Sequence, residues 1–413
     1  MGKTFIADKE TLDKCWNVLS ADGIYGFIEH QATLSPEQRI EYIGMNKEFT
    51  PLTVNKNTGA ANYGSWADFP ILAANKPWMV KNDGTPDYRL DENDYTKKED
   101  GTASDVANTS YAGGAFSWLK KIWKQEYMQG DDRVVKFSLR ARDGFEAVGF
   151  KDDSSELEGV WIPMFYGSIV SSTMRTLSGL QPAYGNQTSA EKTAIDAVGS
   201  RARFLGGPII STITDLLIMF AKTTDTQEAY GNGNMNGYDA SLTPTMGVKQ
   251  NAVIGGGQFY GTNDGKSLNK IFHSIVLGSW QQWQRDPYTI CVNGKLKVSK
   301  TYSYALDASG YANTGIDYTS VGDTDWHYPH RYRSIPGFGS VPSEPPYNGS
   351  SVLGGCDGFI VNAEITAVGR RFGACDYGDH DGLRALHLGN SAAAASCSTG
   401  ASVLLLPPAG VAA

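Results

Sequence analysis

Several segments in the first half of the chain alternate between apolar and polar residues, which predicts short β-strands. The segment "GIYGFIEH" (residues 23–30) alternates in this way, and so does "DRVVKFSLRAR" (132–142). In "GVWIPMFYGSIV" (159–170) the apolar residues are nearly continuous, which is typical of a mostly buried strand. Residues 51–112 are rich in Asn, Asp and Gly, which favours turns. These patterns predict a β-rich region over residues 1–165.

Two helical patterns follow. In "TSAEKTAIDAVGSRARF" (188–204), Thr188 and Glu191 have the spacing of a capping box. In "GGPIISTITDLLIMFAKT" (206–223), Pro208 occupies a position that suits the first turn of a helix. The second segment also carries an apolar face that predicts packing against a core, made of Ile209, Ile213, Leu216, Leu217 and Phe220. Beyond this helix we expect loops and short strands, with a surface insertion at the Pro-, Gly- and Ser-rich stretch 334–351.

Composition narrows the class of protein. The 413 residues include 41% hydrophobic and only 19% charged residues, which favours two or three folded domains over extensive disorder. The 47 glycines and 11% aromatic residues favour strands and turns over a helical bundle. A net charge of −8 argues against binding to the nucleic-acid backbone. The chain has neither an apolar run long enough to span a membrane nor a signal peptide, so we expect synthesis in the cytoplasm and release, if any, by lysis.

The common catalytic and metal-binding motifs are missing from the sequence. It contains no G-x-S-x-G, H-E-x-x-H or P-loop, and its five cysteines form no C-x-x-C pair. A group of acidic, thiol and imidazole side chains between residues 375 and 387 could in principle bind a metal, but its spacing fits no known site. We therefore expect no enzyme activity, no cofactor and no metal.

One motif is specific enough to suggest a family. The stretch "GSWQQWQRD" places Gly278, Trp280, Trp283 and Asp286 in a pattern that resembles the G-N-x-W-E-W-x-x-D signature of the formylglycine-generating-enzyme type of C-type lectin fold. The later segments "VGRRFGACDYG" and "TGASVLLLPP" follow in the family's order. In particular, the chain resembles variable proteins of diversity-generating retroelements and related phage tail-tip proteins. The upstream stretches "NYGSWADFP" and "FYGSIVSSTMRTLSGLQP" also resemble segments of phage tail proteins.

This resemblance implies an α+β C-type lectin-like domain over residues 166–413, preceded by the β-rich region 1–165 as a virion-attachment or oligomerisation region. It implies that the Trp motif is structural and that a segment near the C-terminus displays variable side chains for binding. The stretch 372–396 is rich in the residue types that mutagenesis of adenine-containing codons produces. The candidate display positions are Phe372, Ala374, Cys375, Asp376, Tyr377, Asp379, His380, Asp381, Arg384 and His387.

The sequence departs from the family pattern at two places. Arg370 and Arg371 stand where the family has two glycines, and Phe372 replaces its tryptophan. Cys375 and Cys397 are too far apart in sequence to match the two reactive cysteines of the oxidase branch, so the resemblance carries no catalytic residues to this chain.

The resemblance implies a phage tail-tip or fibre protein that binds a protein or glycan receptor on the host bacterium. Its expected location is the virion tail, its partners are other tail proteins, and the family expectation is a homotrimer that gains binding strength through multivalency. It implies no nucleic-acid partner and no membrane insertion. Two alternatives remain open: a fixed structural or decoration protein of the virion, and an enzyme of the glycan-acting or formylglycine-generating type, which would need its own catalytic groups.

Overall fold

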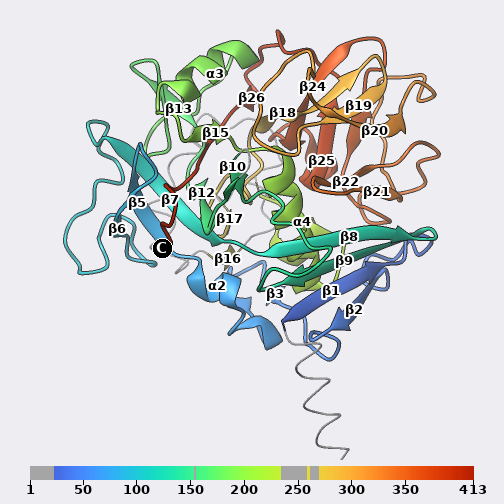
Figure 1. The fold of residues 1–413 in the computed structure, drawn as a ribbon, viewed down its shortest axis with the longest axis horizontal. Helices are drawn as coiled ribbons and strands as arrows, with labels where there is room; N and C mark the ends of the chain where they lie inside the picture. The colour runs from blue at the N-terminus through green and yellow to red at the C-terminus, as the bar shows by residue number, and fades with distance from the viewer. Residues whose placement is uncertain (1–22, 153–154, 234–257, 261–268) are drawn as a thin grey trace, which may run out of the picture.

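A computed structural model describes residues 23–152, 155–233, 258–260 and 269–413. The alternating segments 23–30 and 132–142 contain strands, as the pattern predicts, and these strands belong to a four-stranded antiparallel sheet. In sheet order its strands are β2 (Ile40–Gly44), β1 (Ile24–Glu29), β9 (Asp132–Ser138) and β8 (Trp123–Gln129). Figure 1 shows this sheet in blue and teal along one side of the molecule. One face is buried because the alternate residues of β1 and β9 point inward.

A six-stranded sheet joins segments from the first half of the chain to its last strand. In sheet order the strands are β15 (Ala202–Phe204), β27 (Val403–Leu405), β12 (Gly159–Pro163), β7 (Gly113–Lys120), β5 (Pro77–Lys81) and β6 (Pro86–Arg89). The continuous apolar run predicted to be mostly buried forms β12, and all five of its residues are buried. The apolar C-terminal segment forms β27, which lies between β15 and β12.

The largest sheet holds the candidate binding segment. Its main path runs through β20 (Ala312–Asp317), β19 (Lys295–Val298), β18 (Trp283–Val292), β24 (Thr366–Phe372), β25 (Gly382–Leu388) and β23 (Phe359–Val361), and β26 (Thr399–Gly400) pairs with β18 in parallel. Five two-stranded pairs complete the described strands: β3 (Thr53–Val54) with β4 (Ala61–Asn62), β10 (Lys151–Asp152) with β11 (Ser155–Glu156), β13 (Ser168–Val170) with β14 (Thr173–Arg175), β16 (Phe259–Tyr260) with β17 (Lys270–Ile271), and β21 (Tyr332–Ile335) with β22 (Gly339–Pro342). The last pair overlaps the start of the predicted surface insertion, which therefore begins within a hairpin.

The helices are short. The described α-helices are α2 (Pro70–Ala74), α3 (Thr188–Asp196), α4 (Gly207–Ala221) and α5 (Thr226–Tyr230), and single 3₁₀ turns are η1 (Gly64–Trp66) and η2 (Gly378–His380). Both predicted helices exist, although the end of the first segment is strand β15 instead. Pro208 does lie in the first turn of α4. The capping box does not form: the Thr188 hydroxyl donates to the Ala392 carbonyl, and Glu191 pairs with Arg285.

Helix α4 is buried on every side, where the sequence pattern predicts only one core-facing stripe. Figure 1 shows it in the middle of the molecule, between the blue-teal sheet and the orange-red sheet. Its one charged residue, Asp215, accepts a hydrogen bond from Arg133 of β9 and forms an ion pair with Lys124 of β8 at 2.6 Å. A buried carboxylate needs such partners because its desolvation is costly.

The predicted fold class is wrong. Among the described residues, about 35% are in strands and 11% in helices, with four α-helices, so the described part of the chain has a β-rich fold. No α+β C-type lectin-like domain is evident. The prediction extended a local resemblance around the Trp motif to a whole domain, but the strands after α4 belong to several sheets, and one of these sheets also contains strands from the first half of the chain.

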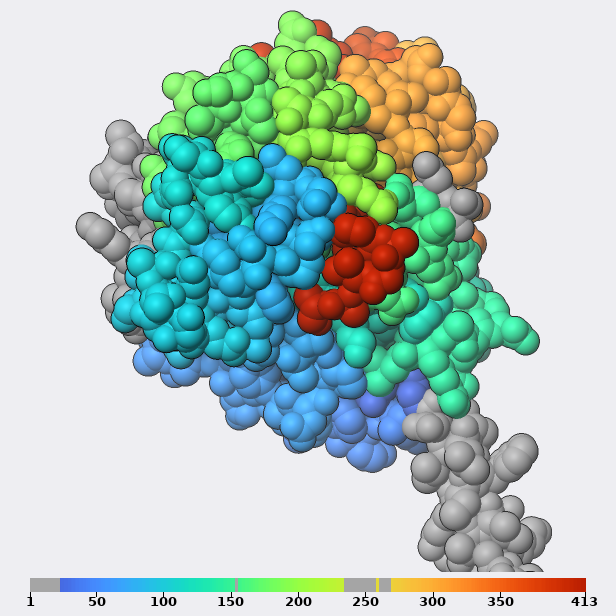
Figure 2. All heavy atoms as spheres, turned by 60° about the vertical axis from the view of Figure 1, so that its left-hand side comes forward, coloured from blue at the N-terminus to red at the C-terminus, as the bar shows by residue number. Residues whose placement is uncertain are grey.

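The boundary predicted at residue 165 passes through a shared sheet and a shared core. Strands β5, β6, β7 and β12 precede it, whereas β15 and β27 follow it in the same sheet. One hydrophobic cluster includes Phe27, Trp161, Phe220 and Leu404. Figure 2 shows the C-terminal residues, in red, seated between blue and green segments of the first half of the chain. The two halves therefore pack as interleaved segments.

Candidate functional site

The candidate binding segment is a short loop between two buried strands. Strand β24 ends at Phe372, and β25 begins at Gly382. The loop between them contains the 3₁₀ turn η2. Within residues 372–388, the non-glycine side chains that reach solvent are Asp376, Tyr377, Asp379 and His380. We call these four residues the loop tip.

The other six candidate display positions do not present a side chain on the surface. Exposure is at most 5% for each of Phe372, Ala374, Cys375, Asp381, Arg384 and His387. The prediction placed ten display positions in the stretch 372–396, but β25 continues a sheet that is covered on both faces, so alternate residues do not point outward. These six residues form the support of the loop tip and not its binding surface.

Asp381 fastens the two ends of the loop together. Its Oδ1 accepts a hydrogen bond from the N–H of Ala374 at 3.0 Å. Gly373 allows this approach, because a Cβ atom at that position would lie 1.8 Å from the same oxygen, and its φ of +124° also favours glycine. Gln227 of α5 donates to the Asp381 carbonyl, which ties the end of the loop to a neighbouring helix. The loop is therefore held at its base from both sides.

Arg384 connects β25 to the N-terminal sheet. Its two terminal nitrogens donate to the two carboxylate oxygens of Glu29, each at 2.8 Å. Glu29 also accepts from Arg39 at 2.9 Å and from Arg133 at 3.2 Å, and all four side chains are buried. Burial by itself would raise the pKa of Glu29, but the charges of Arg384, Arg39 and Arg133 hold it well below its ordinary value. Glu29 is therefore ionised in the fold.

Aromatic rings support the loop tip from the other side. Trp326 stacks at 6.0 Å on buried Trp283, lies at a tilt 4.5 Å from His380, and meets Tyr377 edge-on at 5.5 Å. Tyr328 stacks on His380 at 5.3 Å, so the His380 ring has Trp326 and Tyr328 as neighbours. Such contacts restrict the tip because each ring removes rotamer freedom from the next.

His387 lies beneath this group of rings. It makes edge-on contacts with Trp283 at 5.5 Å and with Trp326 at 5.9 Å. Its Nδ1 accepts the N–H of Gly389 at 3.0 Å. Burial, assisted by the nearby charge of Arg370, lowers the pKa of His387 to about 3, so the ring is neutral and serves as a packing element.

The Trp motif lies at the base of the same sheet. Gly278, Trp280, Trp283 and Asp286 are all buried. Asp286 is the hub: Oδ1 accepts from the N–H of Gly207 at 2.8 Å, and Oδ2 accepts from Thr289 at 2.7 Å and from Arg371 at 2.9 Å. Arg371, which departs from the family pattern, thus links β24 to β18 and to the start of α4.

Two buried carboxylates, those of Asp357 and Asp381, lie behind the loop. Asp357 Oδ2 accepts the N–H of Arg384, while Asp357 Oδ1 and Asp381 Oδ2 are buried and have no hydrogen-bond partner in the described part of the chain. Burial raises the pKa of both side chains well above the ordinary value for aspartate. The two groups are therefore held in the protonated form more readily than an exposed aspartate.

The sequence analysis missed Trp326 and Tyr328, which contact the loop tip, and Glu29 and Asp357, which support it. The stretch "DTDWHYPHRYR" (323–333) gave a signal, because aromatic and histidine residues are unusually dense there without a core periodicity. The sequence around Glu29 contained no such signal, because its partner Arg384 is 355 positions away.

Among the residues that the structure describes, no group of three or more His, Cys, Asp or Glu side chains could hold a metal ion. No helix in the same part of the chain is long and apolar enough to cross a membrane. No model of a known protein family matches the chain, and no curated protein matches it either. The geometry of the site is therefore the basis for assigning a function.

Proposed function

We propose that this chain is a receptor-binding protein of a phage tail, and that the loop tip is the part of it that touches the host surface. The carrying observation is the contrast within 372–388: four adjoining side chains reach solvent, and every other non-glycine residue is buried. Binding residues on a loop over a rigid scaffold can change without loss of the fold. This arrangement suits a surface that is rewritten by mutation.

The chemistry of the loop tip favours recognition. Tyr377 and His380 offer half-buried rings, and Asp376 and Asp379 offer exposed carboxylates beside them. Tyrosine gives a large contact area at a low entropy cost, and charged groups at the rim add specificity. Because Asp381, Trp326 and the strand ends hold the loop, little conformational entropy is lost on binding.

The remaining parts of the proposal follow from this role. A receptor-binding protein of this kind would be made in the bacterial cytoplasm and assembled into the virion tail beside other tail proteins. One small loop makes a weak contact, so a homotrimer that presents three tips would gain by multivalency. The receptor would be a protein or a glycan of the host surface.

Population sequencing of the gene in a propagating phage tests the diversification. We expect substitutions at codons 376, 377, 379 and 380, few at codons 381, 384 and 387, and none at the Trp motif codons 278–286. An equally low frequency of substitutions in all three groups of codons would contradict a diversified surface. The chain would then be a fixed binding or decoration protein.

Cell binding tests the receptor role directly. Fluorescently labelled protein should bind to the bacterium in which the phage propagates, and excess unlabelled protein should compete. The double variant Tyr377→Ala with Asp379→Ala should lose most of this binding. Asp143→Ala removes another exposed carboxylate, outside the loop tip, and should bind like the parent. Absence of cell binding by the parent protein would overturn the proposal.

A further inference from the structure

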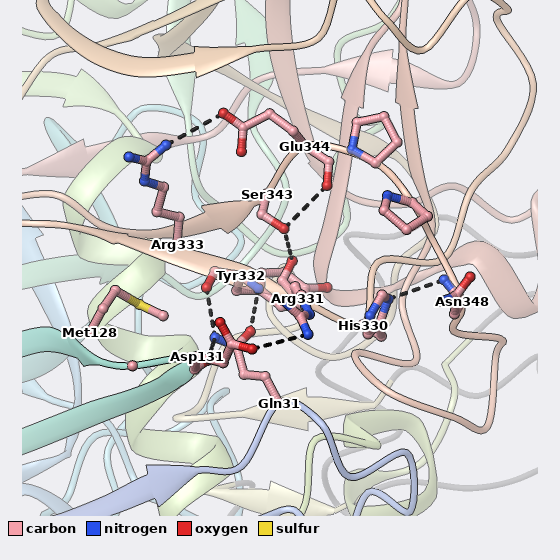
Figure 3. Close-up of a pocket in the computed structure, with 13 residues that line it drawn as sticks. Gln31, Met128, Asp131, His330, Arg331, Tyr332, Arg333, Ser343, Glu344 and Asn348 are labelled. Atoms are coloured by element: carbon pink, nitrogen blue, oxygen red, sulfur yellow. Dashed lines mark hydrogen bonds and ion pairs between the residues drawn. The ribbon is translucent and has the colours of Figure 1, made fainter.

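The charged groups of the cleft in Figure 3 are already paired with one another. This cleft, of about 580 Å³, lies between the N-terminal sheet and the β21–β22 hairpin. Arg331 pairs with Asp131 at 3.2 Å, and Arg333 pairs with Glu344 at 3.4 Å. The two guanidinium groups turn apart toward these partners, which also line the cleft. The lining therefore has no net charge that would select an ionic ligand.

A smaller pocket of about 320 Å³ adjoins the loop tip and has a different charge balance. Its lining brings together Asp379 of the loop tip, four residues in and around α5, and Ser351 with Val352. We call it the acidic pocket. Its volume lies near the lower limit for small-molecule sites, roughly 300–1,000 Å³, so it has room for a single side chain of a partner.

The walls of the acidic pocket are fixed. Gln227 lines the pocket, and its Nε2 donates to the Asp381 carbonyl at the base of the loop. Ser350 and Leu353 exchange backbone hydrogen bonds of 3.0 and 3.2 Å, which close the turn that carries Val352. These bonds hold both sides of the pocket in place before a ligand arrives, so little order has to be created on binding.

The lining carries a net negative charge. Asp225, Glu228 and Asp379 line the pocket, and its lining includes no lysine or arginine. Lys56 lies outside the lining and pairs with Glu228. In the part of the chain that the structure describes, Asp379 takes part in no ion pair. The carboxylates therefore outnumber the neighbouring cation, which favours a cationic ligand.

The pocket also contains hydrogen-bond acceptors that the fold leaves unused. Asp225 is only 8% exposed, and among the described residues its carboxylate accepts one hydrogen bond, from the N–H of Glu228 to Oδ1 at 2.8 Å. Asn232 Oδ1 is buried and has no partner in the same part of the chain. Burial raises the pKa of Asp225, because its charged form is poorly solvated. A ligand that carries positive charge and N–H donors would relieve both shortages.

An exposed apolar group lies beside these acceptors. Val352, which lines the pocket, is 61% exposed, and its neighbour Leu353 is exposed as well. Leu34 extends this apolar area, because the N–H of Gly354 donates to its carbonyl at 2.8 Å. Lysine and arginine side chains pack their alkyl stems on such a surface while the charged end reaches polar groups. The pocket therefore suits a cation on an alkyl stem.

A metal ion fits the pocket less well than an organic cation. Among the residues that the structure describes, no group of three or more acidic, thiol or imidazole side chains is placed to hold a metal. We propose that the acidic pocket binds one arginine or lysine side chain of a protein on the host surface. Its charged end would meet Asp225 and Asp379, and its stem would pack on Val352. This inference rests on the proposed receptor role of the loop tip, and it selects a protein as the receptor.

Saturation-transfer NMR on the full chain at low ionic strength tests this inference, because it detects weak binding of small molecules. The probes are acetyl-arginine amide, acetyl-lysine amide, the uncharged analogue acetyl-citrulline amide, and glucosamine as an amino sugar. We expect the two basic amides to bind, the citrulline amide not to bind, and added salt to weaken binding. Absence of binding by both basic amides, or equal binding by the citrulline amide, would overturn the inference. Equal binding by glucosamine would overturn the choice of a protein receptor.

Variants of the lining measure the role of each carboxylate. Asp379→Asn and Glu228→Gln should each weaken binding of acetyl-arginine amide by up to about fivefold, as expected for loss of a partly exposed charge pair. Asp225→Asn should weaken it by about tenfold, because the lost charge is buried, while asparagine still accepts the N–H of Glu228. Asp143→Asn makes the same change at an exposed site outside the pocket and should have no effect. Unchanged affinity in all three lining variants would contradict the inference.

A variant with a gain of binding keeps the test decisive if a lining variant unfolds. Lys56→Gln frees Glu228 from its partner and should tighten binding of acetyl-arginine amide by up to about fivefold. Such a gain cannot arise from a damaged fold. Weaker binding in Lys56→Gln would contradict the role of the pocket's charge.

Competition on cells separates this inference from the proposed function. Excess acetyl-arginine amide should reduce binding of the labelled parent protein to the host bacterium, and acetyl-citrulline amide should not. Cell binding that stays unchanged in saturating acetyl-arginine amide would overturn this inference and leave the receptor role intact. Absence of cell binding by the parent protein, with the amide still bound in solution, would overturn the receptor role and, with it, the partner named here.

Discussion

Arg384 of β25 donates a pair of hydrogen bonds, each 2.8 Å long, to the carboxylate of Glu29 in β1, across 355 positions of sequence. The pair is fully buried and joins the sheet that carries the loop tip to the N-terminal sheet. The support of the candidate binding surface therefore includes the beginning of the described chain. This relationship also explains why Arg384 is not available to a receptor.

Arg384→Ala should destabilise the protein strongly. Removal of one partner leaves the Glu29 charge buried with fewer donors, which typically costs about 3–5 kcal/mol. Chemical denaturation at pH 7 measures the change. Lys295→Ala is the matched control, because it removes an exposed ion pair with Asp317, and it should change the free energy of unfolding by less than about 1 kcal/mol. Similar small losses in both variants would contradict the support role of Arg384.

The ion pairs of Glu29 also set a dependence on acid. The folded protein holds the pKa of Glu29 well below the unfolded value, so this stabilisation is complete above the unfolded pKa of about 4.3 and is lost as pH falls through the folded pKa. The penalty of Arg384→Ala, measured by denaturation at several pH values, should therefore shrink on the acid side of that value. A penalty that stays constant down to the lowest pH at which the protein folds would contradict the ionised state of Glu29.

Asp381→Asn should show the opposite trend. Burial raises the pKa of Asp381 well above its ordinary value, so the wild-type side chain costs stability as pH rises from the unfolded pKa toward the folded pKa. Asparagine keeps an oxygen that can accept the Ala374 N–H and has no charge to bury. The free energy of unfolding of the variant, relative to that of the wild type, should therefore increase between about pH 4 and pH 7. Urea unfolding measures this difference. A difference that does not change with pH would contradict this account.

The two glycines of the loop should differ sharply in their tolerance of alanine. At Gly373 a Cβ would overlap the Asp381 carboxylate. Gly373→Ala should therefore break the hydrogen bond between Ala374 and Asp381 and lower the free energy of unfolding by at least about 2 kcal/mol. At Gly378 the φ is also positive, but a Cβ would meet open space, and Gly378→Ala should cost only about 1 kcal/mol. Thermal unfolding compares the stability of the two variants. Equal losses of stability would argue against the role of the Ala374–Asp381 hydrogen bond in holding the loop.

Every position from 372 to 388 can be tested at once by saturation mutagenesis with protease resistance as the measure of folding. We expect Asp376 and Asp379 to accept most residues with changes within about 0.5 kcal/mol, because exposed sites away from special contacts rarely matter to stability. Tyr377 and His380 should tolerate fewer changes, because their rings pack on Trp326. Ala374, Asp381 and the β25 positions should reject most changes. Broad tolerance at Ala374 or intolerance at Asp379 would contradict the division into tip and support.

Several local elements could be predicted from the sequence because their signals are short in range. The alternation around residues 24–29 and 132–138 specified β1 and β9, and Pro208 marked the first turn of α4. Each of these follows from a side-chain period or from the geometry of one residue.

The sequence by itself determined strands β1 and β9 of the first sheet and the existence of helix α4. Only the tertiary structure decided the sheet partners, the fold class and which side chains of 372–388 reach solvent. Arg384 and Asp379 illustrate the reason. Both are charged residues in one polar stretch, but Arg384 pairs with the buried carboxylate of Glu29 from β1, whereas Asp379 is exposed. The burial of Arg384 depends on a partner that lies 355 positions away, and no local sequence pattern records that contact.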